Sequence, residues 1–409
     1  MSLFEITALL MVLTALFSYI NYRMLHMPTT IGVMFIALVF SLGIVAVSWL
    51  GFDVGQGRIA KILETIDFDQ TLLHGMLSFL LFAGAMHIKI EDLRSQKWAI
   101  AVLASAGVIA STFIVGTLTW FVLDVLGTPI SFIFCLLFGA LISPTDPVAV
   151  IGILKTAGVT KSLETKIAGE SLFNDGIGVV VFMIILQLAQ GGVEVSFGKV
   201  VLLFIEEAVG GALLGLTIGF IAYQMLKRVN NYQVEVIITL ALVMGGYALA
   251  DRVHTSGPIA IVVAGLLIGN HGRAFAMSDT TRERLDDFWE LMDEILNALL
   301  FMLIGLEVLI MPFTWPLFIT GLLAIGITLF ARWASVGGAV FLMRSFRSFS
   351  PGVVRILTWG GLRGGISVAL ALSIPSVPER TTIITITYII VVFSIVVQGM
   401  TLGRLAKKL

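Results

Sequence analysis

Apolar stretches of about 20 residues recur along almost the whole chain, separated by short polar segments. A helix of that length spans the roughly 30 Å hydrocarbon core of a bilayer. Because lipid offers the backbone no hydrogen-bond partner, such stretches must fold as helices there. Only 12% of the residues are charged and 58% are hydrophobic, whereas soluble domains carry about 25% charged residues. The chain is therefore expected to be an all-α polytopic membrane protein.

Hydropathy predicts about thirteen transmembrane helices in a single membrane domain that covers residues 1–409. The longest polar connection, residues 272–290, is too short to fold alone. The N-terminal segment lacks the basic region of a signal peptide, so the first helix is expected to be retained. The expected spans are 3–21, 30–50, 71–88, 98–123, 130–153, 167–190, 200–226, 234–250, 256–271, 291–310, 315–343, 356–375 and 381–403.

Lysine and arginine are distributed unevenly between the two sets of alternating loops. Of the 25 basic residues, 18 lie in the odd-numbered loops and the C-terminus, and five lie in the even-numbered loops. The other two, Arg332 and Arg363, lie inside expected helices. Since cytoplasmic loops carry the excess of basic residues, the C-terminus is predicted to be cytoplasmic. An odd number of helices then places the N-terminus outside, and the expected location is the inner (cell) membrane.

Two expected helices, the fifth and the twelfth, contain residues that interrupt helical structure. In SPTDPVAV (143–150), Pro144 and Pro147 flank Asp146, and each proline removes a backbone donor and clashes with the preceding turn. In WGGLRGG (359–365), four glycines surround Arg363, and each weakens a helix by up to about 1 kcal/mol. Both helices are therefore expected to be broken.

The two breaks occupy matching positions in two halves of the chain. This arrangement indicates a transporter built from inverted repeats, in which two broken helices cross. The repeats are expected over about 3–190 and 234–403, with the helix 200–226 as a spacer.

Polar residues gather in GESLFNDG (169–176), inside an otherwise apolar helix. At 100° per residue, Ser171, Asn174 and Asp175 share a face about 100° wide. Their oxygen atoms are the ligands that hard cations prefer. Asp146 is expected to approach this face from the broken helix, where the unwound backbone at Thr145 offers a carbonyl. The prediction is a small oxygen cage for a cation near the membrane midplane, without the His or Cys ligands that favour a transition metal.

Three further charges inside expected helices require partners, because an unpaired charge at that depth costs at least about 2.5–3.5 kcal/mol. Glu170 and Arg332 are predicted to form a structural ion pair. Arg363 has two interpretations: it neutralises partial charges at the helix break, or it pairs with a residue of the tenth helix, for which the candidates are Glu294, Glu307 and Asn297.

Other classes of protein fit the chain less well. The single cysteine, Cys135, excludes a disulfide framework, and no basic tail indicates a nucleic-acid partner. Asp146 and Asp175 could together form an intramembrane aspartyl protease, in which two carboxylates share a proton. They lack the Gly-x-Gly-Asp pattern of such proteases, however, and proteolysis leaves the paired breaks unexplained. A transporter without a cofactor is predicted, and not an enzyme.

Six motifs in order along the chain resemble those of bacterial sodium/proton antiporters of the NhaP type, relatives of the animal sodium/proton exchangers in the monovalent cation/proton antiporter superfamily. The resemblance covers essentially the whole membrane domain. The motifs are SPTDPVAV (143–150), GESLFND (169–175), SGPIAIVVAGLLIGN (256–270), LIGLEV (303–308), FARWASV (330–336) and WGGLRGGISVALAL (359–372).

The resemblance implies a homodimer in membrane lipid, in which a core bundle moves against a dimerisation bundle. It implies that Asp175 binds a cation and a proton in turn, with Asp146, Ser171 and Thr145 as further sodium ligands. Asn174 resembles the electroneutral branch, where the electrogenic branch has a second aspartate. Glu170 and Arg332 correspond to the pair that stabilises the core.

The expected activity is exchange of sodium or lithium for protons by alternating access, because cation and proton compete for one carboxylate. The resemblance at Asn174 implies that the exchange is electroneutral, one cation for one proton. The third helix carries Phe82 and Ala83 where some relatives have an acidic residue. That difference leaves potassium/proton exchange as the alternative.

Overall fold

The computed structural model describes residues 3–51, 57, 75–157, 160–191, 196–311, 314–345, 349 and 352–407, and every regular element within them is helical. The elements are α1 (Leu3–Ile20), η1 (Asn21–Leu25), α2 (Thr29–Trp49), α4 (Leu77–Met86), α5 (Ile90–Ala104), α6 (Ala106–Val125), α7 (Phe132–Ile142), α8 (Val148–Ala157), α9 (Lys161–Ala189), α10 (Phe197–Leu226), α11 (Tyr232–Arg252), α12 (Gly257–Leu267), η3 (Ile268–Gly272), α13 (Arg273–Phe275), α14 (Asp279–Leu306), η4 (Glu307–Leu309), α15 (Trp315–Met343), α16 (Val353–Trp359), α17 (Gly365–Leu372), α18 (Arg380–Phe393), η5 (Ser394–Gln398) and α19 (Gly399–Ala406).

The described part of the chain contains nine helices long and apolar enough to cross a membrane, together with two shorter apolar helices, α4 and α7. These described helices agree with the expected all-helical, multi-pass class. The expected number of thirteen spans stays a prediction. Residues 71–74 of the third expected span lie outside the described residues, as do four of the counted basic residues, Arg58, Lys61, Arg347 and Lys408.

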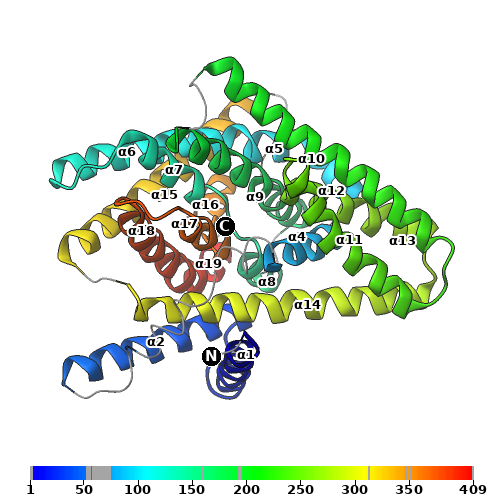
Figure 1. Cartoon of the computed structure of the whole chain (residues 1–409), viewed down its shortest axis with the longest axis horizontal. Helices are drawn as coiled ribbons and strands as arrows, with labels where there is room; N and C mark the ends of the chain where they lie inside the picture. The colour runs from blue at the N-terminus through cyan, green and yellow to red at the C-terminus, as the bar shows by residue number, and fades with distance from the viewer. Residues whose placement is uncertain are drawn as a thin grey trace.

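Helix α14 runs across the molecule, with α2 packed along one side (Figure 1). It also contacts α4, α11 and α17. Helix α12 packs between α10 and α4 and contacts α9, while α15 packs against α6 and α18. These contacts bury a continuous apolar core. Helix α9, which carries the GESLFNDG motif, therefore lies inside the bundle and not at its surface.

Both expected helix breaks are present. Helix α7 ends at Ile142 and α8 begins at Val148, while α16 ends at Trp359 and α17 begins at Gly365. The two non-helical segments contact each other directly, because the backbone N–H of Asp146 donates to the carbonyl of Leu362 over 2.8 Å. Backbone groups that the prolines and glycines release from helical bonding thus satisfy one another, as buried backbone groups must.

Two expected helix boundaries were wrong. The span 98–123 is two helices that meet at Ser105, and the first of them already begins at Ile90. The polar segment 272–290 is not a loop throughout, because α14 begins at Asp279, where the hydroxyl of Ser278 caps the helix by accepting from the N–H of Thr281. Hydropathy measures transfer into lipid and not helix formation, so it misses polar turns that extend a membrane helix.

Candidate cation-binding site

Helix α9 brings the four polar residues of its motif into the protein interior. Glu170, Ser171, Asn174 and Asp175 are each no more than 6% exposed. Gly178, on the same helix, allows the first break to approach, because a Cβ there would overlap the ring of Pro144. The close contact between α9 and the break therefore depends on glycine at position 178, opposite Pro144.

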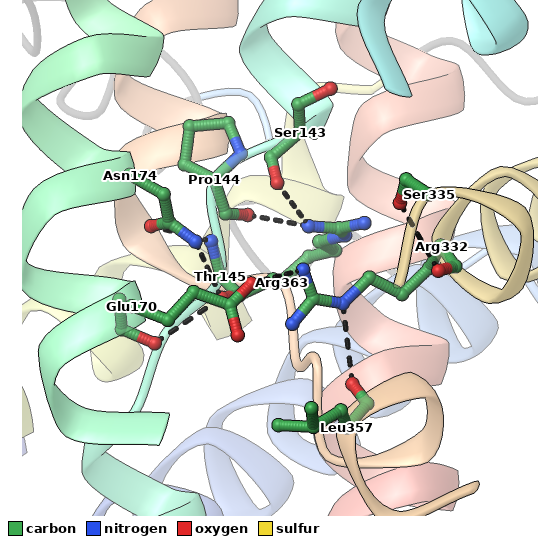
Figure 2. Close-up of polar contacts among 10 residues, drawn as sticks. Ser143, Pro144, Thr145, Glu170, Asn174, Arg332, Ser335, Leu357 and Arg363 are labelled. Carbon is green, nitrogen blue, oxygen red and sulfur yellow. Dashed lines mark hydrogen bonds and ion pairs between the residues drawn. The ribbon is translucent and has the colours of Figure 1, made fainter. Parts of the chain in front are cut away.

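Thr145 is held at the centre of the first break by two side chains of α9 (Figure 2). The Nδ2 of Asn174 donates to the Thr145 hydroxyl over 2.9 Å, and the Oδ1 of Asn174 accepts from the Thr145 N–H over 3.4 Å. The hydroxyls of Thr145 and Ser171 lie 3.2 Å apart. Three of the predicted site residues are thus in direct contact, and Asn174 fixes the conformation of the break.

Asp146 and Asp175 complete the predicted set. Asp146 is half-buried beside the second break, and a Cβ at Gly364 would overlap its carboxylate. Asp175 is 6% exposed, and its Oδ1 has no hydrogen-bond partner among the described residues. The two carboxylates are close enough to interact electrostatically. A buried carboxylate with an unsatisfied oxygen, in the field of a second carboxylate, favours a cation or a proton.

Glu170 and Arg332 form the expected buried contact, in which Nη1 of Arg332 donates to Oε1 of Glu170 (Figure 2). The Nε of Arg332 donates to the carbonyl of Leu357 in α16 over 3.2 Å. The guanidinium therefore joins α15, α9 and α16. The predicted structural role of the pair stays a prediction, which these contacts support, because removal of one partner would leave the other charge buried alone.

The structure distinguishes the two interpretations of Arg363. Its Nη1 donates to the carbonyls of Ser143 and Pro144 over 2.5 and 2.8 Å, across from the second break to the first (Figure 2). The hydrogen bonds of this guanidinium therefore neutralise carbonyls at the C-terminal end of α7, as the first interpretation states. They do not go to α14, the tenth expected helix, or to Glu307 immediately after it.

Sequence reasoning missed two residues of this region. Ser394 accepts from the backbone N–H of Arg363 over 2.8 Å, and Gln398 donates to the carbonyl of Trp359 over 2.9 Å. Both lie in the π-helical turn η5 of the last membrane segment. The sequence does contain a signal for both residues. They are polar, lie four positions apart in an apolar stretch, and so share one helix face.

The described residues contain no group of three or more His, Cys, Asp and Glu side chains placed to hold a metal ion. What the site offers is two carboxylates, two hydroxyls and backbone carbonyls between two broken helices. Half-helix ends and unwound carbonyls at mid-membrane are the usual means by which membrane transporters bind ions. Fold and site together are those of a multi-pass membrane transporter.

Residues 12–408 match the family model described as the transmembrane sodium/hydrogen exchanger. The chain is 52% identical to the Na(+)/H(+) antiporter NhaP of Pseudomonas aeruginosa over 99% of this chain and 96% of the relative. It is 34% identical to the Na(+)/H(+) antiporter NhaH of Halobacillus dabanensis over 95% and 93% of the two chains. The structure of the sodium proton antiporter MjNhaP1 from Methanocaldococcus jannaschii superposes with a TM-score of 0.77, at 21% identity over 98% of this chain and 97% of that one.

The chain belongs to the sodium/hydrogen exchanger family. Its relatives are transporters, so the predicted family and the expectation of a transporter and not an enzyme are confirmed.

Proposed function

We propose that this protein exchanges one sodium or lithium ion for one proton across the cell membrane, at Asp175. The observation that carries the proposal is the position of Asp175. Its carboxylate is buried with an unsatisfied oxygen, on the same helix as Ser171 and Asn174, which contact Thr145, and it interacts electrostatically with Asp146. The names of the relatives, which describe sodium/proton antiporters, support the same activity.

Exchange follows from competition for one carboxylate. A proton neutralises Asp175 in one half of the cycle, and a sodium ion held by Asp175, Asp146, the Ser171 hydroxyl and Thr145 neutralises it in the other. A carboxylate that carries neither a proton nor a cation is costly at this depth. The empty site is therefore unfavourable, and its reorientation across the membrane without a bound ion is suppressed. Asp146 stays ionised throughout this cycle, and Asn174 resembles the electroneutral branch of the family, so one charge moves in each direction.

Access alternates between the two sides of the membrane. We assign the inverted repeats to about 3–190 and 234–403, with 200–226 between them, and the breaks at 143–147 and 360–364 as their matching segments. The protein works as a homodimer whose core bundles move against a fixed dimerisation bundle. Its N-terminus lies outside and its C-terminus in the cytoplasm.

The proposal is tested in proteoliposomes that hold a pH-sensitive dye under an imposed pH gradient. Sodium, lithium and potassium are added separately to the protein and to Asp175→Asn, which keeps the size of the side chain but removes the titrating group. We expect proton movement with sodium and lithium, none in Asp175→Asn, and no dependence on an imposed membrane potential. Transport that survives in Asp175→Asn would overturn the mechanism.

The alternative, potassium/proton exchange, is supported by one observation. Helix α4 presents buried apolar residues, Phe82 and Ala83, where some relatives carry an acidic residue, so one ligand that would favour a small ion is missing. An equal response to potassium in the same assay would move the assignment to this alternative.

A further inference from the structure

The last membrane segment carries three polar side chains that all contact the second helix break. Ser394 accepts from the N–H of Arg363 over 2.8 Å, Gln398 donates to the carbonyl of Trp359 over 2.9 Å, and the Thr401 hydroxyl accepts from the indole N–H of Trp359 over 2.9 Å. We call Ser394, Gln398 and Thr401 the polar ladder. Their spacing of four and three residues places them on one helix face.

Two members of the polar ladder, Ser394 and Gln398, satisfy backbone groups on both sides of the break. Trp359 is the last residue of α16, so its carbonyl has no partner within the helix. Arg363 lies two residues before the first residue of α17, where the chain has left helical geometry. Ser394 and Gln398 are fully buried. One face of a single helix thus fixes the start and the end of the break.

Packing around this segment leaves a small gap. A small cavity lies between the break, α15 and the last membrane segment, lined by Arg332, Thr358, Gly361, Arg363 and Gln398 among others. A side chain next to a cavity lacks contact partners on that side. Hydrogen bonds therefore add to packing as a restraint on Arg363 and on the break.

The position of Arg363 is transmitted to the cation site through contacts described above. Its guanidinium holds the carbonyls of Ser143 and Pro144, immediately before Thr145 and Asp146. The carbonyl of Leu362, one residue before Arg363, accepts from the N–H of Asp146. A displacement of residues 362–363 therefore moves both ends of the segment that carries two predicted ligands.

We propose that Ser394 and Gln398 are positioning residues for transport, which set the geometry of the first break through Arg363 without touching the ion. The π-helical turn that carries them fits this role, because π-helical turns in α-helices occur frequently at functional sites. The effect on sodium affinity rests on the proposed sodium/proton exchange, whereas the structural coupling between the two breaks does not.

The first test is hydrogen exchange of the full-length protein in lipid nanodiscs, comparing Ser394→Ala with the unchanged chain. The matched control is Thr385→Val on α18, whose buried hydroxyl donates to the carbonyl of Thr381 in its own helix and to no other group among the described residues. We expect Ser394→Ala to speed exchange in peptides covering 360–364 and also in peptides covering 143–147, where the Asp146 amide lies. Thr385→Val should change neither.

The second test measures transport by the same variants in proteoliposomes. Ser394→Ala and Gln398→Leu are expected to raise the sodium concentration for half-maximal rate by at least about threefold, the scale of one lost buried hydrogen bond. Ser394→Thr, which keeps the hydroxyl, should restore the value, and Thr385→Val should leave it unchanged. Faster exchange confined to 360–364, with unchanged sodium affinity, would overturn the positioning role. If the unchanged chain does not respond to sodium, the proposed function fails, and the exchange data at 143–147 still decide the coupling.

Discussion

Glu170 and Asp175 lie five residues apart on one helix, but their surroundings give them different roles. Glu170 is 1% exposed and receives a hydrogen bond from the guanidinium of Arg332, whereas an oxygen of Asp175 has no partner among the described residues. A carboxylate held by a fixed cation is already neutralised and has no need of a mobile one. The carboxylate without such a partner is the one we expect to exchange its proton for a cation.

Removal of Glu170 should therefore damage the fold and not the selectivity. Glu170→Ala leaves Arg332 buried without its counter-charge, at a cost of about 3–5 kcal/mol. Thermal unfolding in detergent, followed by loss of the size-exclusion peak, should show a markedly lower midpoint. Glu164→Ala, at the first turn of the same helix, should change stability by less than about 1 kcal/mol.

The double variant Glu170→Ala/Arg332→Ala removes both charges together. It should be less destabilised than the sum of the two single variants, because residues in one ion pair are coupled. A well-folded Glu170→Ala protein with altered sodium affinity would contradict the structural assignment and place Glu170 among the ligands.

At the scale of helices, the two breaks depend on glycines at points of close approach. Gly364 is the clearest case, because a Cβ there would overlap the carboxylate of Asp146. We expect Gly364→Ala to displace that carboxylate and reduce sodium-driven transport at least about tenfold, with the protein still inserted in the membrane. Gly338→Ala on α15 is the control, since nothing lies within 4 Å of a Cβ at that position and alanine favours a helix. Full activity of Gly364→Ala would show that the breaks need not approach this closely.

The same breaks show how far sequence alone reaches. Proline and glycine act on their own backbone, so the interruptions around Asp146 and Arg363 could be predicted locally. The partners of Arg363 could not be predicted from the sequence, because Ser143 and Ser394 become its neighbours only through tertiary packing. The start of α14 was missed for a different reason: its first turns are polar, and hydropathy detects only the apolar part of a helix.

At the scale of the whole molecule, the predicted orientation can be tested directly because the single cysteine, Cys135, is buried. Lys407→Cys and Asp124→Cys each add one exposed thiol, at the C-terminal end and at the end of α6. A membrane-impermeant maleimide should label Asp124→Cys in intact cells and Lys407→Cys only in inside-out vesicles. The reverse pattern would invert the proposed topology, and the unchanged chain provides the background.

The hydrogen bond between the Asp146 N–H and the Leu362 carbonyl has a consequence for how the family can diversify. It joins the two breaks through main-chain atoms, which every residue except proline supplies. Side chains around the ion can therefore change by mutation while this link between the two halves persists. Ion preference can therefore change through substitutions of the ligand side chains, while the hydrogen bond between the two breaks is kept.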